Sequence, residues 1–149
     1  TCLVTPASGR EFWAVLVPEL AVQSLDRALA FYCGLCGFHQ RFSRPEDGFA
    51  YLELGQAQIM LEEIVAETWR TGALDHPLGR GMNLQIEVDD LGQLEARLET
   101  ADWPLFEAVE TVWYRDGDIE HGQRQVLVQD PDGYLLRFIQ PLGERTVTG

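Results

Sequence analysis

The chain has 149 residues, 46% of them hydrophobic and 10% aromatic, which suits a single domain with a buried core. Lys and Arg together number 11 against 24 Asp and Glu, so the formal net charge is −13 at pH 7. This charge disfavours nucleic acid and anionic membranes as partners and favours a cationic ligand, although an acidic surface also serves solubility alone. No run of about 18 apolar residues and no N-terminal signal pattern occurs, so we expect a cytoplasmic protein.

The first half, about residues 12–65, predicts one strand, one helix and three further strands. Residues 12–23 have a strand pattern, in which Pro18 indicates an edge, a bulge or a break. Ser24 is a candidate N-cap for a helix that extends to Gly34, because apolar residues recur there at helical spacing. The three strands that follow are predicted at 38–42, 49–54 and 57–64, with turns at 44–48 and 55–56.

Cys33 and Cys36 have the spacing of a redox or zinc motif. They close the predicted helix, where the dipole disfavours a thiolate, and no second pair completes a zinc site. We interpret both as small buried thiols, and three cysteines in all fit a reducing compartment.

The second half, about residues 82–141, repeats this order after a linker at 66–81 that is rich in Gly and Pro. Asp89 or Asp90 caps a predicted helix. The predicted strands lie at 82–88, 105–114, 123–129 and 134–140, with an acidic loop at 115–122. A shift of 66 residues places Leu20, Val22 and Leu25 on Ile86, Val88 and Leu91. We therefore predict one domain, residues 1–149, built of two similar halves.

The last two predicted strands are joined by a tight turn at Asp130–Gly133. Pro131 presets φ for such a turn, and Gly133 accepts a positive φ at no steric cost. The strand after the turn alternates in period two, which places Arg137 on one face of it. This face therefore carries a cation at a position where neighbouring strands can converge.

Several sequence motifs, taken in chain order, resemble those of the glyoxalase/bleomycin resistance/extradiol dioxygenase superfamily, also called vicinal oxygen chelate proteins. They are residues 20–32 leading to Gly37 and Phe38, residues 86–91, and residues 130–133, within the paired units. The resemblance covers about residues 13–140. It implies an α+β fold of two βαβββ modules with sheets curled around a cavity. It also implies a homodimer, to which the segment through Trp13 could contribute an arm.

Metal-using members of this family hold His, Gln or Glu at inward strand positions. The resemblance places these positions at Val17, about Met60, Asn83 and Arg137. Valine has no lone pair, a thioether suits soft metals only, and a guanidinium would repel the ion. We therefore expect no metal, no cofactor and no catalytic residue. A register shift of one or two residues would bring in Glu19 or Glu62.

The chain most resembles the bleomycin resistance branch, which implies a metal-independent protein that sequesters a cationic antibiotic or a similar small molecule. The aromatic rings would stack on the ligand, Glu62 or Asp118 would meet its cation, and Arg137 would orient a carbonyl or carboxylate. The predicted ligand-binding residues are Met60, Glu62, Trp69, Asn83, Trp113, Tyr114, Asp118 and Arg137.

Two alternatives to sequestration stay open, and both are enzymes. One is a metal-dependent glyoxalase-like or dioxygenase-like enzyme that holds its ion with Glu62, His76 or His121. The other is a metal-free acid–base enzyme that uses Glu62 and Arg137.

Overall fold

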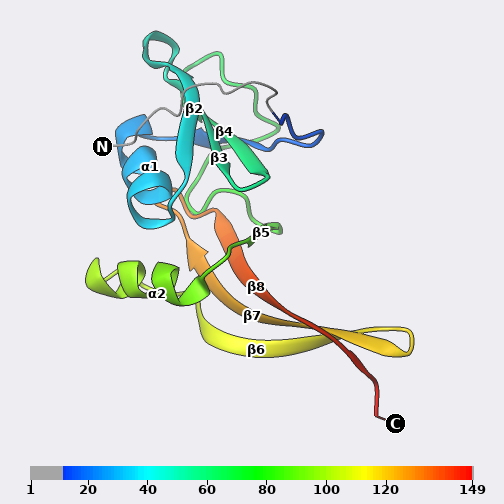
Figure 1. Ribbon diagram of the computed structural model, residues 1–149. Coiled ribbons are helices and arrows are strands. Elements are labelled where there is room, and N and C mark those ends of the chain that lie inside the picture. Colours follow the sequence, from blue (N-terminus) through cyan, green and yellow to red (C-terminus); the bar gives the residue numbers. More distant parts are fainter. Residues whose placement is uncertain (1–11, 149) are drawn as a thin grey trace. The chain divides into compact units, whose positions relative to one another are not determined.

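The computed structural model describes residues 12–148; residues 1–11, which include most of the predicted N-terminal arm, lie outside the described part, as does residue 149. The chain divides into two compact units, one of residues 1–78 and 130–133 and the other of residues 79–129 and 134–149. Each unit contains one four-stranded sheet, shown in Figure 1. An α+β fold of two βαβββ modules is therefore confirmed.

The first unit contains a sheet with strand order β1-β4-β3-β2, in which β1 and β4 are parallel and the other pairs antiparallel. The helical elements are the α-helix α1, the π-helical turn η1 and the 3-10 turn η2. The bounds are β1 (Glu19–Val22), α1 (Leu25–Leu29), η1 (Ala30–Leu35), β2 (His39–Arg44), η2 (Pro45–Asp47), β3 (Phe49–Leu54) and β4 (Ala57–Glu63).

The predicted first strand is too long, since β1 begins only at Glu19, after Pro18. Pro18 has no N–H to give to a sheet, although its carbonyl accepts a hydrogen bond from the Met60 N–H at 2.8 Å. The predicted N-cap is confirmed: the Ser24 hydroxyl accepts a hydrogen bond from the Arg27 N–H at 3.2 Å. The α1 and η1 segment covers one face of the sheet, and no helix among the described residues of this unit covers the other face.

The core of the first unit lies between this helical segment and the sheet. Alternate residues of β1, β3 and β4 point to it, as period two requires. The buried side chains are Leu20, Val22, Leu25, Ala28, Phe31, Tyr32, Ala50, Leu52, Ile59 and Leu61. Cys36 is also buried there and is a free thiol. Cys33 takes part in a disulfide bond, so the interpretation of a buried thiol is wrong for that residue.

The second unit contains a sheet with strand order β5-β8-β7-β6, in which β5 and β8 are parallel. The bounds are β5 (Asn83–Glu87), α2 (Leu91–Thr100), β6 (Glu107–Asp116), β7 (Ile119–Gln129) and β8 (Leu135–Thr146). The Asp90 carboxylate caps α2 by accepting from the Gln93 N–H at 3.1 Å. Leu91, Leu94 and Leu98 of α2 are buried, as are Val126, Val128, Leu136 and Phe138 of the sheet. No helix within residues 12–148 is long and apolar enough to span a membrane.

The predicted acidic loop at 115–122 is wrong. Strands β6 and β7 continue through most of it, and only Gly117 and Asp118 form the turn between them. Strand β8 likewise runs beyond the predicted end at 140 and pairs with β7 as far as Thr146. The end of β6 and the start of β7 form a long hairpin. This hairpin and the end of β8 extend away from α2 (Figure 1).

The turn at Asp130–Gly133 belongs to the first unit, although the strands on either side belong to the second. The buried Asp130 carboxylate accepts hydrogen bonds from the Tyr32 hydroxyl at 2.7 Å and from the Asp132 N–H at 2.9 Å. The Asp132 carboxylate accepts from the Gln23 N–H at 3.1 Å. Gly133 has a φ of 95°, as the turn prediction requires. These bonds hold the turn against η1 and the end of β1.

Candidate functional site

The open face of the first sheet contains two neighbouring rows of side chains that concern the site. Pairing across the strands aligns Glu19, Met60, Tyr51 and Phe42 in one row. It aligns Ala21, Glu62, Phe49 and Arg44 in the next. Met60 and Glu62 are two residues apart on β4, so both predicted site residues point to this face.

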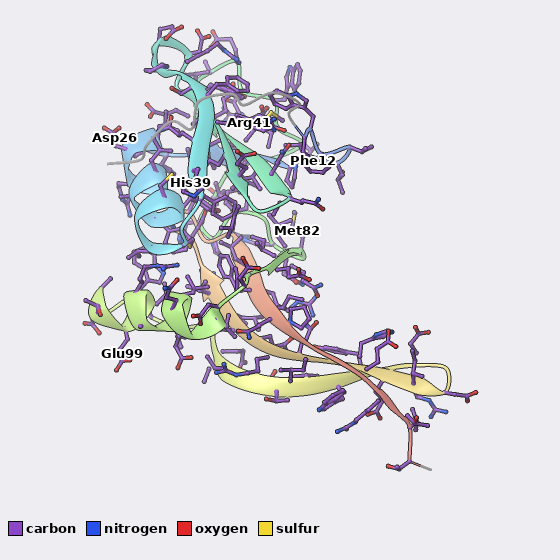
Figure 2. The ribbon with its side chains drawn as sticks, in the orientation of Figure 1. Phe12, Asp26, His39, Arg41, Met82 and Glu99 are labelled. Carbon is purple, nitrogen blue, oxygen red and sulfur yellow. The ribbon has the colours of Figure 1, made fainter. Side chains whose placement is uncertain are left out.

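The N-terminal residues pack over one part of this face. The Trp13 ring makes edge contacts with Tyr51 and Phe42, at centroid distances of 5.3 and 6.2 Å. The Arg41 guanidinium lies 3.7 Å from the centroid of Trp13 and donates a hydrogen bond to the Phe12 carbonyl. Figure 2 shows Arg41 and Phe12 on the side of β2 away from α1. The row that contains Tyr51 and Phe42 is therefore partly covered.

A pocket of about 410 Å³ lies beside this covered part. Its walls combine four carboxylates, two aromatic rings and one guanidinium. The lining residues are Glu19, Arg44, Asp47, Phe49, Glu62, Glu67 and Trp69. Two of the predicted site residues, Glu62 and Trp69, are thus brought together. Trp69 is 95% exposed.

Glu19 and Glu62 are neighbouring carboxyl groups within the pocket. Burial, a hydrogen bond to Glu62 and the negative charge of Glu62 raise the pKa of Glu19, while the positive charge of Arg44 lowers it. Two carboxylates within hydrogen-bond reach of each other repel when both are ionised. A bound cation would relieve that repulsion.

Arg44 already places a cation against a ring in this pocket. Its guanidinium lies 4.0 Å from the centroid of Phe49, and its Nε donates to the Asp47 carboxylate at 3.2 Å. Both side chains of this ion pair are well exposed. The pocket therefore contains an aromatic face and a carboxylate that together bind a cation, here the guanidinium of Arg44.

The open face of the second sheet contains Asn83 and Arg137. Pairing aligns Gln85, Arg137, Leu127 and Glu107 in one row, opposite to the face that α2 covers. In the next row the buried Gln125 amide donates to Glu110 at 2.9 Å and accepts from the Tyr114 hydroxyl at 3.1 Å. The Gln123 amide also donates to Gln125, at 3.0 Å. Three neighbouring side chains thereby hold the Gln125 amide in place.

Trp113 and Tyr114 point to opposite faces of the second sheet, because they are adjacent on β6. The Trp113 ring lies against Gly122, and the Arg145 guanidinium lies 3.9 Å from the ring centroid. A ligand on one face of this sheet cannot contact both aromatic rings. Asp118 lies in the turn at the tip of the hairpin, where its carbonyl accepts from the Val147 N–H at 3.0 Å.

The residues at the expected metal positions do not fit a divalent ion. Val17 lies before β1, while Met60, Asn83 and Arg137 lie on strands and offer a thioether, an amide and a cation. Within residues 12–148 no group of three His, Cys, Asp or Glu side chains is arranged to hold a metal. His76 lies in an irregular segment, and His121 pairs with Asp116 at 2.9 Å and Glu144 at 3.4 Å. The nearby carboxylates, chiefly through the hydrogen bond to Asp116, raise the pKa of His121.

Sequence reasoning missed several pocket residues. The sequence predicted Glu19 only as the result of a register shift. It did not predict Arg44, Asp47, Phe49 or Glu67 as site residues. The period-two pattern assigns Arg44 to one face of strand β2 and Phe49 to one face of strand β3. Their meeting with β1 depends on the parallel pairing of β1 with β4, which no local pattern specifies.

The fold places the chain in the class of paired βαβββ proteins. The chain belongs to the Glyoxalase/Bleomycin resistance protein/Dioxygenase superfamily, whose sequence profile matches residues 14–138.

Two curated relatives and one solved structure are similar to this chain. The bleomycin resistance protein of Geobacillus stearothermophilus is 27% identical over 139 residues, covering 85% of this chain and 96% of the relative. A probable lactoylglutathione lyase of Synechocystis is 26% identical over 125 residues, covering 81% and 90%. The crystal structure of TioX from Micromonospora superposes with a TM-score of 0.67 at 21% identity, covering 87% and 100%, and supports the fold.

Proposed function

We propose that the protein is a metal-independent binding protein of the bleomycin resistance type, which sequesters a cationic small molecule. The observation that carries this proposal is the pocket in the first unit, where four carboxylates surround two aromatic rings. The similarity to curated bleomycin resistance proteins over 85% of the chain supports the same function. Sequestration requires binding alone and no catalytic group.

The chemistry of the pocket favours a cation over a neutral or anionic ligand. Its four carboxylates face a single guanidinium, so the lining has a net negative charge. A cation over an aromatic face gains about 0.5–2 kcal/mol, more as water is excluded. The net charge of −13 adds a long-range attraction that speeds the encounter with a cation at low salt.

The exposed ring of Trp69 supplies a direct readout. We expect bleomycin to quench tryptophan fluorescence and to raise the melting temperature, because binding buries this ring and stabilises the fold. Trp69→Phe should lose most of the quench. Trp103→Phe, which replaces a tryptophan whose indole N–H donates to the Gln129 carbonyl at 3.0 Å, should keep it. Fluorescence and melting temperature that both stay flat at high micromolar bleomycin would contradict the proposal.

A metal-dependent glyoxalase-like enzyme is the second candidate, favoured by the similarity to a probable lactoylglutathione lyase. It requires a ligand set that differs from the one at the expected positions. Elemental analysis after dialysis separates the two functions. Stoichiometric Zn, Ni, Mn or Fe would favour the enzyme, whereas substoichiometric metal with intact bleomycin binding would favour sequestration.

We further propose that the protein is a homodimer. The outer edge of β6 and the edge of β8 beyond Ile139 have no paired strand within the described residues. Open edges of this kind are covered in stable proteins, and a second copy of the chain would cover them by symmetry. Light scattering should give about twice the chain mass of 16.8 kDa. A value equal to the chain mass would contradict the dimer.

A further inference from the structure

We propose that Arg137 anchors a subsite in the second unit, which binds a planar oxygen acceptor of a ligand, either a carboxylate or a carbonyl. This ligand chemistry is opposite to that of the cation pocket. The inference rests on the second unit alone and does not depend on the function proposed above.

The Nε of Arg137 is a buried donor that lacks a hydrogen-bond partner among residues 12–148. Other arginines of the chain are paired with carboxylates, namely Arg41, Arg44, Arg124 and Arg145. Arg137 forms no ion pair with the described part of the chain. A buried donor without a partner destabilises a fold. Its presence on this sheet face is therefore explained if a bound ligand supplies the acceptor.

The rest of the guanidinium remains accessible to such an acceptor. No side-chain hydrogen bond of Arg137 occurs within residues 12–148, and Nε is its only nitrogen that is both buried and unsatisfied, so the two terminal nitrogens reach the surface. A carboxylate that approaches side-on accepts from Nε and one terminal nitrogen together, whereas a carbonyl oxygen accepts from one of them. A lysine offers a single point charge at that place and cannot reproduce the planar pair of donors.

The neighbours of Arg137 define what else the subsite selects. Exposed amides of Gln85 and Asn83 lie on the adjacent strand β5 and can donate further hydrogen bonds. Leu127 and Leu135 give the same face an apolar surface for the body of the ligand. The exposed carboxylates of Glu87 and Glu107 lie on this face as well, and they disfavour phosphates and other polyanions. The subsite therefore suits a single acceptor group on a partly apolar molecule.

Benzoate and benzamide are suitable probes, since both are planar and only one is charged. The test follows the ¹⁵Nε–¹Hε signal of Arg137, which is assigned by its absence from Arg137→Lys. We expect benzoate to shift this signal to lower field with saturation, because the Nε–H then donates to a carboxylate. A shift with benzoate alone assigns a carboxylate subsite, and a shift with both probes assigns a carbonyl oxygen subsite.

Arg124 supplies a matched control on the same sheet. It lies on the opposite face and pairs with Glu95 at 3.8 Å. Arg137→Lys should weaken benzoate binding about tenfold, and Arg124→Lys should leave it unchanged. An Nε signal that does not move at 20 mM of either probe, or equal benzoate affinity of Arg137→Lys and the wild type, would overturn the subsite. Neither of these outcomes bears on bleomycin binding, which reports on the proposed function separately.

Discussion

At Arg137 a charged group sits in a position that costs stability. Replacing it with Met removes the unpaired Nε–H and keeps the aliphatic stem, while Arg124→Met removes the same charge from the other face of the sheet. We expect Arg137→Met to be more stable than Arg124→Met by about 1 kcal/mol in free energy of unfolding, measured in urea. If Arg137→Met is the less stable variant, Arg137 has a structural role instead.

At Glu19 the expected effect is a dependence of stability on pH. Burial and the Glu62 carboxyl raise the pKa of Glu19 in the folded protein above its ordinary value of 4.5. Between those two pKa values the folded state binds more protons than the unfolded state. The contribution of Glu19 to the free energy of unfolding is therefore complete below pH 4.5 and is lost as the pH rises through the pKa of the folded state. Urea titrations should therefore show Glu19→Gln gaining stability over the wild type from pH 4.5 to pH 7. Parallel pH profiles of the two proteins would contradict this origin.

The sequence predicted which site residues share a face where those residues lie on the same strand. Met60 and Glu62 fall on one face because period two alone decides it, and Arg137 follows from its distance to the turn at Gly133. The proximity of Glu19 to Glu62 could not be predicted in the same way, because it depends on the register between two strands about 40 residues apart.

At the scale of elements, the hairpin of β6 and β7 depends on one close approach. A Cβ atom on Gly122 would lie 2.5 Å from the Trp113 ring, well inside normal contact. We expect Gly122→Ala to lower the free energy of unfolding by about 1–3 kcal/mol and to change the near-ultraviolet circular dichroism of Trp113. Gly34→Ala is the control, since a Cβ at Gly34 meets no atom within 4 Å. Equal effects of the two substitutions would show that the ring does not pack as described.

Most elements were predicted because their apolar residues keep a clear period. Helix α2 begins at its predicted cap, and β3 has its predicted bounds. Two errors share a local cause. The prediction at 12–23 ran through Pro18. The prediction at 115–122 gave weight to the acidic residues around Asp118 instead of to Gly117-Asp118, a two-residue hairpin turn with glycine, at a φ of 62°, in its first position.

At the scale of the whole molecule, the net charge of the chain and the lining of the pocket are both negative. The chain carries a net charge of −13, and the pocket of the first unit gathers four carboxylates around two rings. The membership in the superfamily was predictable, since its phrases recur in order along the chain. The composition of the pocket was not predictable, because residues from β1, β2, η2, β3, β4 and the segment after β4 converge there only in the folded unit.

We infer that the pocket carboxylates bind a cation without a metal. Calorimetric titration with metal-free bleomycin in the presence of EDTA measures this binding. Glu62→Gln removes one pocket carboxylate, and Glu144→Gln removes the same charge from the exposed pair with His121. We predict that the wild type and Glu144→Gln bind equally and that Glu62→Gln binds about tenfold more weakly. Loss of all binding in EDTA, or an unchanged affinity of Glu62→Gln, would contradict the claim.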